Sequence, residues 1–149
     1  MSDRNRLKVL IVEDHLEEAF PLATLLGADG NRVRIAADGE MALRKVLLEQ
    51  PDVVLLDLGI PKLDGLEVAT AVRSAHLPWR PWLVAVSGHD EPEVREQAEA
   101  AGIDDFFVKP IDPAELRALV RLLPPAPETA KTGQVRTASS EPRTGILDA

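Results

Sequence analysis

The chain contains no cysteine among its 149 residues. This absence excludes a disulfide scaffold, a thiolate metal site and a cysteine nucleophile. No apolar run approaches the ~20 residues that a membrane-spanning helix needs. The polar start of the chain, residues 1–8, also lacks the apolar core of a signal peptide. We therefore expect a cytoplasmic location and no membrane partner.

Basic residues are outnumbered by acidic ones. The chain has 17 lysines and arginines against 25 aspartates and glutamates, so its formal net charge is −8. Acids and bases balance from residue 124 onward, which places the whole excess of negative charge in residues 1–123. A negative surface matches the phosphates of nucleic acid poorly, so we expect no nucleic-acid partner.

Five short β-rich runs alternate with helical patterns in the first part of the chain. The runs lie at residues 7–12, 32–36, 53–56, 82–86 and 106–108. The patterns between and after them repeat apolar side chains every three or four residues, as amphipathic helices do. Pro21 lies inside the first helical pattern, where it removes a backbone donor and should kink the helix.

Strands that alternate with helices predict an α/β fold with a parallel sheet covered by helices on both faces. With right-handed crossovers, five such units most naturally give the flavodoxin-like strand order 2-1-3-4-5. We expect one domain over residues 1–123. The Pro-Pro-Ala-Pro run that follows ends the last helix, and residues 124–149 are expected to form a disordered tail or linker without a second domain.

Polar residues follow four of the five predicted strands. Glu13 and Asp14 follow the first strand, Asp57 the third, Ser87 the fourth and Lys109 the fifth. Because the carboxyl ends of parallel strands meet at one edge of a sheet, these side chains should converge there. Each residue alone has a plainer interpretation as a helix cap, a turn residue or a solvated surface group.

The combination indicates a specific chemistry. Carboxylates packed together repel one another and need a compensating cation. Oxygen ligands without histidine or cysteine favour a hard cation, Mg²⁺ before Ca²⁺. A metal, an oxygen nucleophile and a lysine are the parts that phosphoryl transfer requires, because that reaction depends on positioning and on neutralising charge at the transferring oxygens.

The chain resembles the receiver domain of bacterial two-component response regulators in the residues at this edge: Glu13-Asp14, Asp57, Ser87 and Lys109-Pro110. The segment 57–65 is similar to the family's stretch after its phosphoacceptor, and residues 100–111 are similar to receivers attached to hybrid sensor kinases. The resemblance covers residues 7–123. It implies a single-domain signalling switch that is not an enzyme, although it assists its own phosphorylation and dephosphorylation.

The resemblance implies that Asp57 is the phosphoacceptor and that a histidine kinase or a histidine phosphotransferase donates the phosphoryl group. Lys109 would pair with a phosphoryl oxygen, and Ser87 would hydrogen-bond the phosphoryl group once it is present. Phe106 occupies the family's switch position, where the ring swings inward after Ser87 moves. The alternative is that Phe106 is simply a strand residue with one buried face, and both descriptions can hold in different states.

A magnesium site is implied in the same way. Asp14, Asp57 and the backbone carbonyl of Gly59 would ligate Mg²⁺, while Glu13 would act through a metal-bound water. The family often has two aspartates where this chain has Glu13 and Asp14, so Glu13 is a mild departure. Gly59 also borders the expected phosphoryl group and, without a side chain, cannot shield it from water.

Two further expectations follow from the resemblance. The Lys109–Pro110 peptide bond should be cis. His89, two residues after Ser87, could position a water that hydrolyses the phosphorylated state, or it could be a solvated loop residue without contact to the site.

Output is expected through protein contacts, because no DNA-binding or enzymatic domain is recognised after residue 123. The expected surface is the face of the fourth helix, fifth strand and fifth helix, which would bind a downstream protein or a second copy of the chain. Passing the phosphoryl group to a second histidine, or docking without phosphorylation, are the alternatives. A flavodoxin-like electron carrier is disfavoured because the loop after the first strand is Glu-Asp-His rather than rich in Ser, Thr and Gly, and an aspartate-nucleophile phosphatase would have Asp-x-Asp there.

Overall fold

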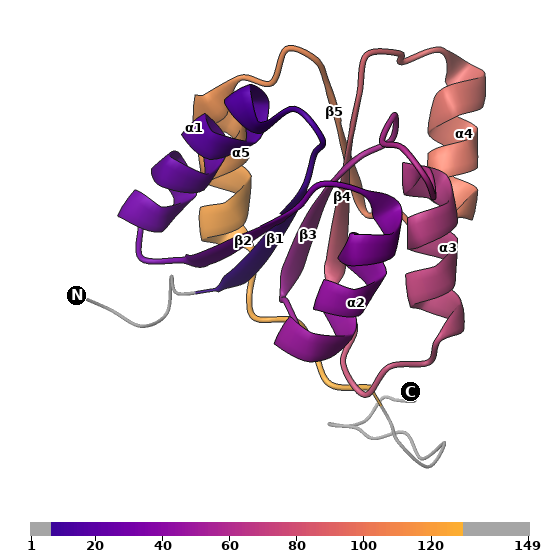
Figure 1. Cartoon of the computed structure of the whole chain (residues 1–149), viewed down its shortest axis with the longest axis horizontal. Helices are drawn as coiled ribbons and strands as arrows, with labels where there is room; N and C mark the ends of the chain where they lie inside the picture. The colour runs from indigo at the N-terminus through magenta and orange to yellow at the C-terminus, as the bar shows by residue number, and fades with distance from the viewer. Residues whose placement is uncertain (1–6, 130–149) are drawn as a thin grey trace.

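A computed structural model describes residues 7–129 of the chain (Figure 1). Its strands are β1 Lys8–Val12, β2 Arg32–Ala36, β3 Val53–Asp57, β4 Trp82–Ser87 and β5 Asp105–Val108. Its helices are α1 Leu16–Ala28, α2 Gly39–Glu49, α3 Gly65–Ser74, α4 Pro92–Ala100 and α5 Pro113–Leu122. None of the helices in this described part is long and apolar enough to cross a membrane.

The strands form one parallel sheet in the order β2-β1-β3-β4-β5. Helices α1 and α5 cover one face of the sheet, and α2, α3 and α4 cover the other (Figure 1). The predicted fold class and strand order are therefore confirmed. The order makes β3 the central strand, so the residue at its carboxyl end lies in the middle of the sheet edge.

Two apolar layers hold the helices to the sheet, and strand β1 shows how one sequence serves both. Val9 and Ile11 pack into the layer under α1 and α5, whereas Leu10 and Val12 pack into the layer under α2 and α3. This alternation follows from the two-residue period of a strand. Strand β3 is buried along its whole length, as expected for the centre of a parallel sheet.

The loop after β3 is held close to the sheet by the start of α3. Asp64 and Glu67 form a reciprocal capping box, in which each carboxylate accepts the other's backbone N–H at 2.9 Å. Gly65 then lies directly on the end of β3, since a Cβ at this position would come within 2.6 Å of the Leu58 Cα. Only glycine permits this approach, which sets the course of the chain just after Asp57.

Helix boundaries mostly match the sequence patterns. Asp112 caps α5 by accepting the Ala114 backbone N–H at 2.9 Å, with Pro113 in the first turn. The proline-rich run ends α5, as expected. Helix α1 continues through Pro21 to Ala28, so this proline does not end the helix, and the expected kink there stays a prediction.

The segment that follows α5 differs from the expectation of a disordered tail. Residues 124–129 run along the amino-terminal edge of the sheet and pair with the loop before β4, through one antiparallel bridge between Trp79 and Glu128. The Ala126 N–H donates to Asp52 Oδ1 at 2.9 Å, and Trp82 Nε1 donates to the Pro124 carbonyl at 3.0 Å. Prolines prevent a helix here, but their carbonyls still accept hydrogen bonds. Residues 124–129 are thus ordered rather than disordered, and residues 130–149, the rest of the expected tail or linker, lie outside the described part.

Candidate functional site

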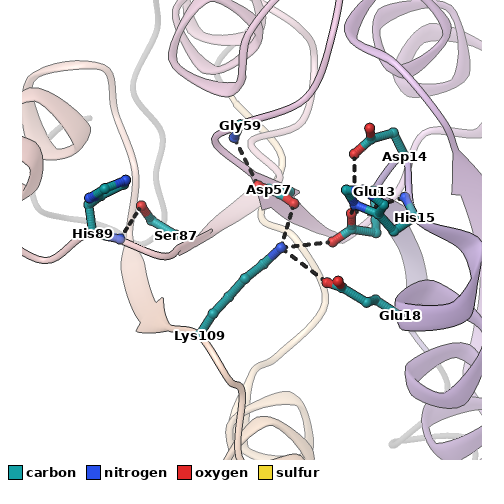
Figure 2. A network of polar contacts seen from close by, with 9 residues as sticks. All are labelled: Glu13, Asp14, His15, Glu18, Asp57, Gly59, Ser87, His89 and Lys109. Atoms are coloured by element: carbon teal, nitrogen blue, oxygen red, sulfur yellow. Dashed lines mark hydrogen bonds and ion pairs between the residues drawn. The ribbon is translucent and has the colours of Figure 1, made fainter.

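The carboxyl ends of the strands bring four of the expected residues together (Figure 2). Glu13 and Asp57 are buried, with exposed fractions of 6% and 7%, and Asp14 is half-buried beside them. One carboxylate oxygen from each of these three residues lies within 4.8 Å of the others. Lys109 reaches the same point from the end of β5, because its Nζ is 2.8 Å from Asp57 Oδ2.

Both oxygens of Asp57 are engaged, which holds the carboxylate in a defined orientation. Oδ2 accepts a hydrogen bond from Lys109 Nζ at 2.8 Å, and Oδ1 accepts one from the Gly59 backbone N–H at 2.8 Å. Asp57 ends the central strand, which is buried along its whole length and positions the side chain at the middle of the sheet edge. The oxygens face the edge where Glu13 and Asp14 lie (Figure 2).

Lys109 contacts more carboxylates than expected. Besides Asp57, its Nζ lies 3.1 Å from Glu18 Oε1 and 3.4 Å from Glu13 Oε1. Glu18 in the first turn of α1 was not singled out from the sequence. Its place in the first turn of the helical pattern after Glu13 and Asp14 was the available signal. This place alone could not show that it reaches a lysine at the end of β5.

The local environment shifts the pKa values of Asp57, Glu13 and Lys109 in different directions. Burial alone would raise the pKa of Asp57, but the hydrogen bonds from Lys109 and Gly59 outweigh burial and hold this pKa below its usual range. Burial, together with the neighbouring Asp57, raises the pKa of Glu13. Burial would lower the pKa of Lys109, yet its bonds to Asp57 and Glu18 raise it instead. Asp57 is therefore ionised at neutral pH and lies beside a firmly protonated lysine.

Carboxylates outnumber the ammonium group at this edge by four to one, counting Glu13, Asp14, Glu18 and Asp57 against Lys109. Such an excess of negative charge favours binding of a cation. The three-carboxylate group Glu13, Asp14 and Asp57 offers oxygen ligands only, which suits Mg²⁺. The donor set in this structure thus fits the metal that the sequence predicted.

His15 adds a second group of possible ligands, together with Glu13 and Glu18. Its Nδ1 is 3.2 Å from Glu13 Oε2 and 3.4 Å from Asp14 Oδ1, and the bond to Glu13 raises the pKa of His15. Sequence reasoning missed this contact. Because Mg²⁺ prefers oxygen ligands and this second group contains a histidine, the all-carboxylate group is the better candidate for Mg²⁺.

Ser87 and His89 are related through the backbone. Ser87 is buried, and its Oγ accepts the His89 backbone N–H at 3.0 Å. The His89 side chain is 75% exposed, its Nδ1 lies 3.7 Å from Glu91 Oε2, and Figure 2 shows the ring apart from the carboxylates. The structure therefore does not bring the imidazole to the site.

The end of β5 carries two further expected features. The Lys109–Pro110 peptide bond is cis, as predicted. Phe106 is half-buried, and the guanidinium carbon of Arg95 on α4 lies 4.5 Å from the centre of its ring. This distance is that of a cation–π contact. Phe106 thus joins β5 to α4 at the surface.

Known proteins share both the sequence pattern and the fold. The family model for the response regulator receiver domain matches residues 9–121. The alkaline phosphatase synthesis transcriptional regulatory protein PhoP of Bacillus subtilis is 34% identical over 116 residues, which make up 78% of this chain and 48% of that protein. The transcriptional regulatory protein PrrA of Mycobacterium tuberculosis is 35% identical over 136 residues, or 90% of this chain and 54% of PrrA. The chain spans about half the length of the curated relatives it matches.

Solved structures agree with these matches. The signal receiver domain of NarL from Mycobacterium tuberculosis has a TM-score of 0.70 at 34% identity, with 77% of this chain and 93% of that one covered. The receiver domain of the Francisella response regulator 1452 has a TM-score of 0.72 at 27% identity over the same shares. Family match, fold and acidic edge agree, and the chain belongs to the response regulator receiver domain family of two-component systems.

Proposed function

We propose that the chain is a phosphorylation-dependent switch in which Asp57 accepts a phosphoryl group from the phosphohistidine of a histidine kinase or histidine phosphotransferase. The observation that carries the proposal is the Asp57 carboxylate itself, ionised at the end of the central strand and held by Lys109 and Gly59. In this reaction a P–O bond forms to an Asp57 oxygen while the P–N bond of the phosphohistidine breaks.

The surrounding residues have complementary roles. Lys109 Nζ lies 2.8 Å from Asp57 Oδ2. It is therefore close enough to donate a hydrogen bond to a phosphoryl oxygen once the phosphoryl group is attached to Asp57. Asp14, Asp57 and the backbone carbonyl of Gly59 would hold Mg²⁺, with Glu13 acting through a bound water. When bound, Mg²⁺ supplies positive charge to the transferring oxygens. The chain thus provides positioning and charge rather than turnover of a separate substrate.

The switch would use Ser87 and Phe106. Ser87 Oγ is held by the His89 N–H, and the Phe106 ring is held by Arg95. We infer that Ser87 leaves this bond for a phosphoryl oxygen and that Phe106 then turns inward. NMR of the Phe106 ring with and without phosphorylation tests this, because an unchanged ring environment would contradict it.

Output through the face of α4, β5 and α5 is part of the proposal. Exposed Glu93, Glu96 and Glu99 line α4, so two copies that met through α4 would repel each other. This favours a downstream protein over a self-dimer. Size-exclusion chromatography with and without acetyl phosphate separates these outcomes. The relatives are named as transcriptional regulators, but for residues 7–129 the expectation of no nucleic-acid contact stays a prediction.

His89 is expected to tune hydrolysis only weakly. Its exposed ring lies beside Glu91 rather than beside Asp57. The half-life of the phosphorylated protein in His89→Ala should stay within about twofold of the parent, well below the ~10²–10⁴-fold of a fully engaged general base. A much longer half-life in this variant would assign the imidazole a direct role.

The test of the central proposal is phosphorylation with acetyl phosphate and Mg²⁺, followed by intact-mass measurement. The parent chain should gain the mass of one phosphoryl group, and Asp57→Asn should gain none. Asp90→Asn, in the exposed loop after β4, is the matched control and should label like the parent. Full labelling of Asp57→Asn would refute the assignment. Labelling without any change in partner binding would leave relay to a second histidine, or docking that ignores phosphorylation, as the function.

A further inference from the structure

Glu18 contacts the proposed reaction site, although neither the family resemblance nor the proposed mechanism gives it a role. Its Oε1 lies 3.1 Å from Lys109 Nζ, while Asp57 Oδ2 lies at 2.8 Å and Glu13 Oε1 at 3.4 Å (Figure 2). An ammonium group has three N–H donors. These three carboxylate oxygens are therefore enough to occupy every donor of Lys109.

We propose that Glu18 is a positioning residue that competes for the Lys109 ammonium and thereby slows phosphorylation of Asp57. The inference rests on the proposed function of Asp57 as phosphoacceptor. It concerns regulation of that same site and assigns Glu18 no contact with the reacting atoms.

The position of Glu18 explains how it can compete. Helix α1 is anchored by the fully buried Ala19, which fixes the adjacent Glu18 at the mouth of the site. The Glu18 side chain is 49% exposed and borders a cavity of about 430 Å³ whose lining includes Asp57, Lys109 and Pro110. The carboxylate therefore lies on the α1 side of the site, on the same cavity as Asp57 and Lys109.

Two consequences of the Glu18 charge act in the same direction. Lys109 must release one carboxylate before it can donate to a phosphoryl oxygen, and Glu18 retains the ammonium on the α1 side. The negative charge of Glu18 also repels a phosphoryl donor, which is itself anionic. Both effects slow the reaction, and both weaken when the charge is removed.

Glu18→Gln isolates the charge from the shape of the side chain. The glutamine amide oxygen can still accept a hydrogen bond from Lys109, so the packing and reach are kept while the negative charge is lost. Glu17→Gln is the matched control, because Glu17 lies in the same helical turn and borders the same cavity. Among the described residues, 7–129, no ion pair joins Glu17 to Lys109.

The experiment measures the initial rate of phosphorylation by acetyl phosphate at fixed Mg²⁺, with intact mass as the readout. Glu18→Gln should react about two- to fivefold faster than the parent, the size expected for a partly exposed ion pair. Glu17→Gln should stay closer to the parent. The advantage of Glu18→Gln should shrink as ionic strength rises, because salt screens exposed charge. A merely structural role of Glu18 would not produce this salt dependence.

Glu18→Asp provides a second variant that keeps the charge but withdraws it from Lys109. Its rate should lie between those of the parent and Glu18→Gln. Equal rates for Glu18→Gln and Glu17→Gln, or a slower reaction of Glu18→Gln, would overturn the inference while leaving Asp57 as phosphoacceptor. Absence of labelling in the parent chain would instead refute the proposed function, so the two failures are distinguishable.

Discussion

The two edges of the sheet use polar side chains in opposite ways. At the amino-terminal edge, a polar residue precedes each of three strands and accepts the first N–H groups of a neighbouring strand. Asn31 before β2 accepts from Leu7 at 3.0 Å, and Asp52 before β3 accepts from Lys8 at 2.9 Å. Asp104 before β5 accepts from Leu83 at 2.9 Å. Each acceptor there completes the sheet.

Charge at the amino-terminal edge is also matched. Asp104 pairs with Arg73 at 2.8 Å and with Arg80 at 3.1 Å, and Asp52 receives a further N–H from Ala126. At the carboxyl edge, three carboxylates share Lys109, and Asp14 adds a fourth negative charge beside Glu13 and Asp57. The first arrangement stabilises the fold. The second holds negative charge in excess, which suits a site for a cation and for phosphoryl transfer. The location of unmatched charge thus separates the functional edge from the structural one.

The sharpest test of this contrast is the metal affinity of the carboxyl edge. Asp14→Ala should lose affinity for Mg²⁺ by roughly 10–100-fold, since loss of even an outer partner of a metal site has effects of this size. Titration calorimetry measures it, with Glu17→Gln as a nearby control that should bind normally. Without Mg²⁺ the variant should be at least as stable as the parent, because a repelling charge has gone. Unchanged affinity would contradict the assignment of Asp14 as a ligand.

The reciprocal test removes matched charge from the amino-terminal edge. Asp104→Ala leaves Arg73 and Arg80 without their carboxylate and the Leu83 N–H without its acceptor. We expect the free energy of unfolding to fall by about 2 kcal/mol. The melting temperature should drop by roughly 6–10 °C. Phosphorylation of the remaining folded protein should be unaffected. A slower reaction at a temperature where the variant is folded would break the proposed separation of the two edges.

Truncation tests the contribution of the segment after α5. A chain that ends after Leu123 loses the bonds of residues 124–129 to Asp52 and to the Trp82 indole. Each such bond contributes ~0.5–1.5 kcal/mol net, but ordering the segment offsets part of the gain. We expect a loss of about 1–2 kcal/mol by denaturant unfolding. A chain that ends after Thr129 keeps these bonds and should match the full chain; equal stability of both truncations would mean that the segment contributes nothing.

The smallest effect is expected from the ion pairs between α1 and α5. Asp29 accepts hydrogen bonds from Arg117 at 2.8 and 2.7 Å and from Arg121 at 3.1 Å. Chiefly the Arg117 guanidinium lowers the pKa of Asp29 from 3.8 to about 2. A lowered carboxyl pKa stabilises the fold above pH 4, and this contribution is lost as the pH falls from about 4 towards about 2.

The size of this effect follows from the exposure of the partners. Both arginine side chains are more than a third exposed, so solvent screening reduces the contribution to about 1 kcal/mol. Denaturant unfolding at a series of pH values should show it as a steeper loss of stability in the parent than in Asp29→Asn. Parallel pH profiles would show that the pair contributes nothing measurable.

Local patterns were sufficient for the architecture and for most of the site. The alternation of strand and helix patterns predicted the order β2-β1-β3-β4-β5, because right-handed crossovers leave few alternatives. The same order places the ends of β1, β3 and β5 at one edge, and so predicted that Glu13, Asp14, Asp57 and Lys109 would meet. The cis bond before Pro110 followed from family resemblance rather than from local physics.

Through-space contacts decided the rest. The pairing of Glu18 with Lys109 joins residues 91 positions apart, and its formation depends on how α1 packs beside α5 and the end of β5 that precedes it. The hydrogen bond from the His89 backbone N–H to Ser87 Oγ depends on the turn after β4. Neither contact leaves a periodic or compositional signal in the chain.

The amino-acid sequence by itself determined where the strands, the helices and Asp57 lie. Those positions depend on the spacing of apolar residues, on the positions of the prolines and on the strand order. It could not determine which cation meets which carboxylate or where residues 124–129 pack. Proline forbids a helix in that segment but does not choose its acceptors, and Asp52 becomes available only once β3 lies beside β1. Tertiary structure decided these contacts, since each one can form only after two elements that are distant in sequence have packed together.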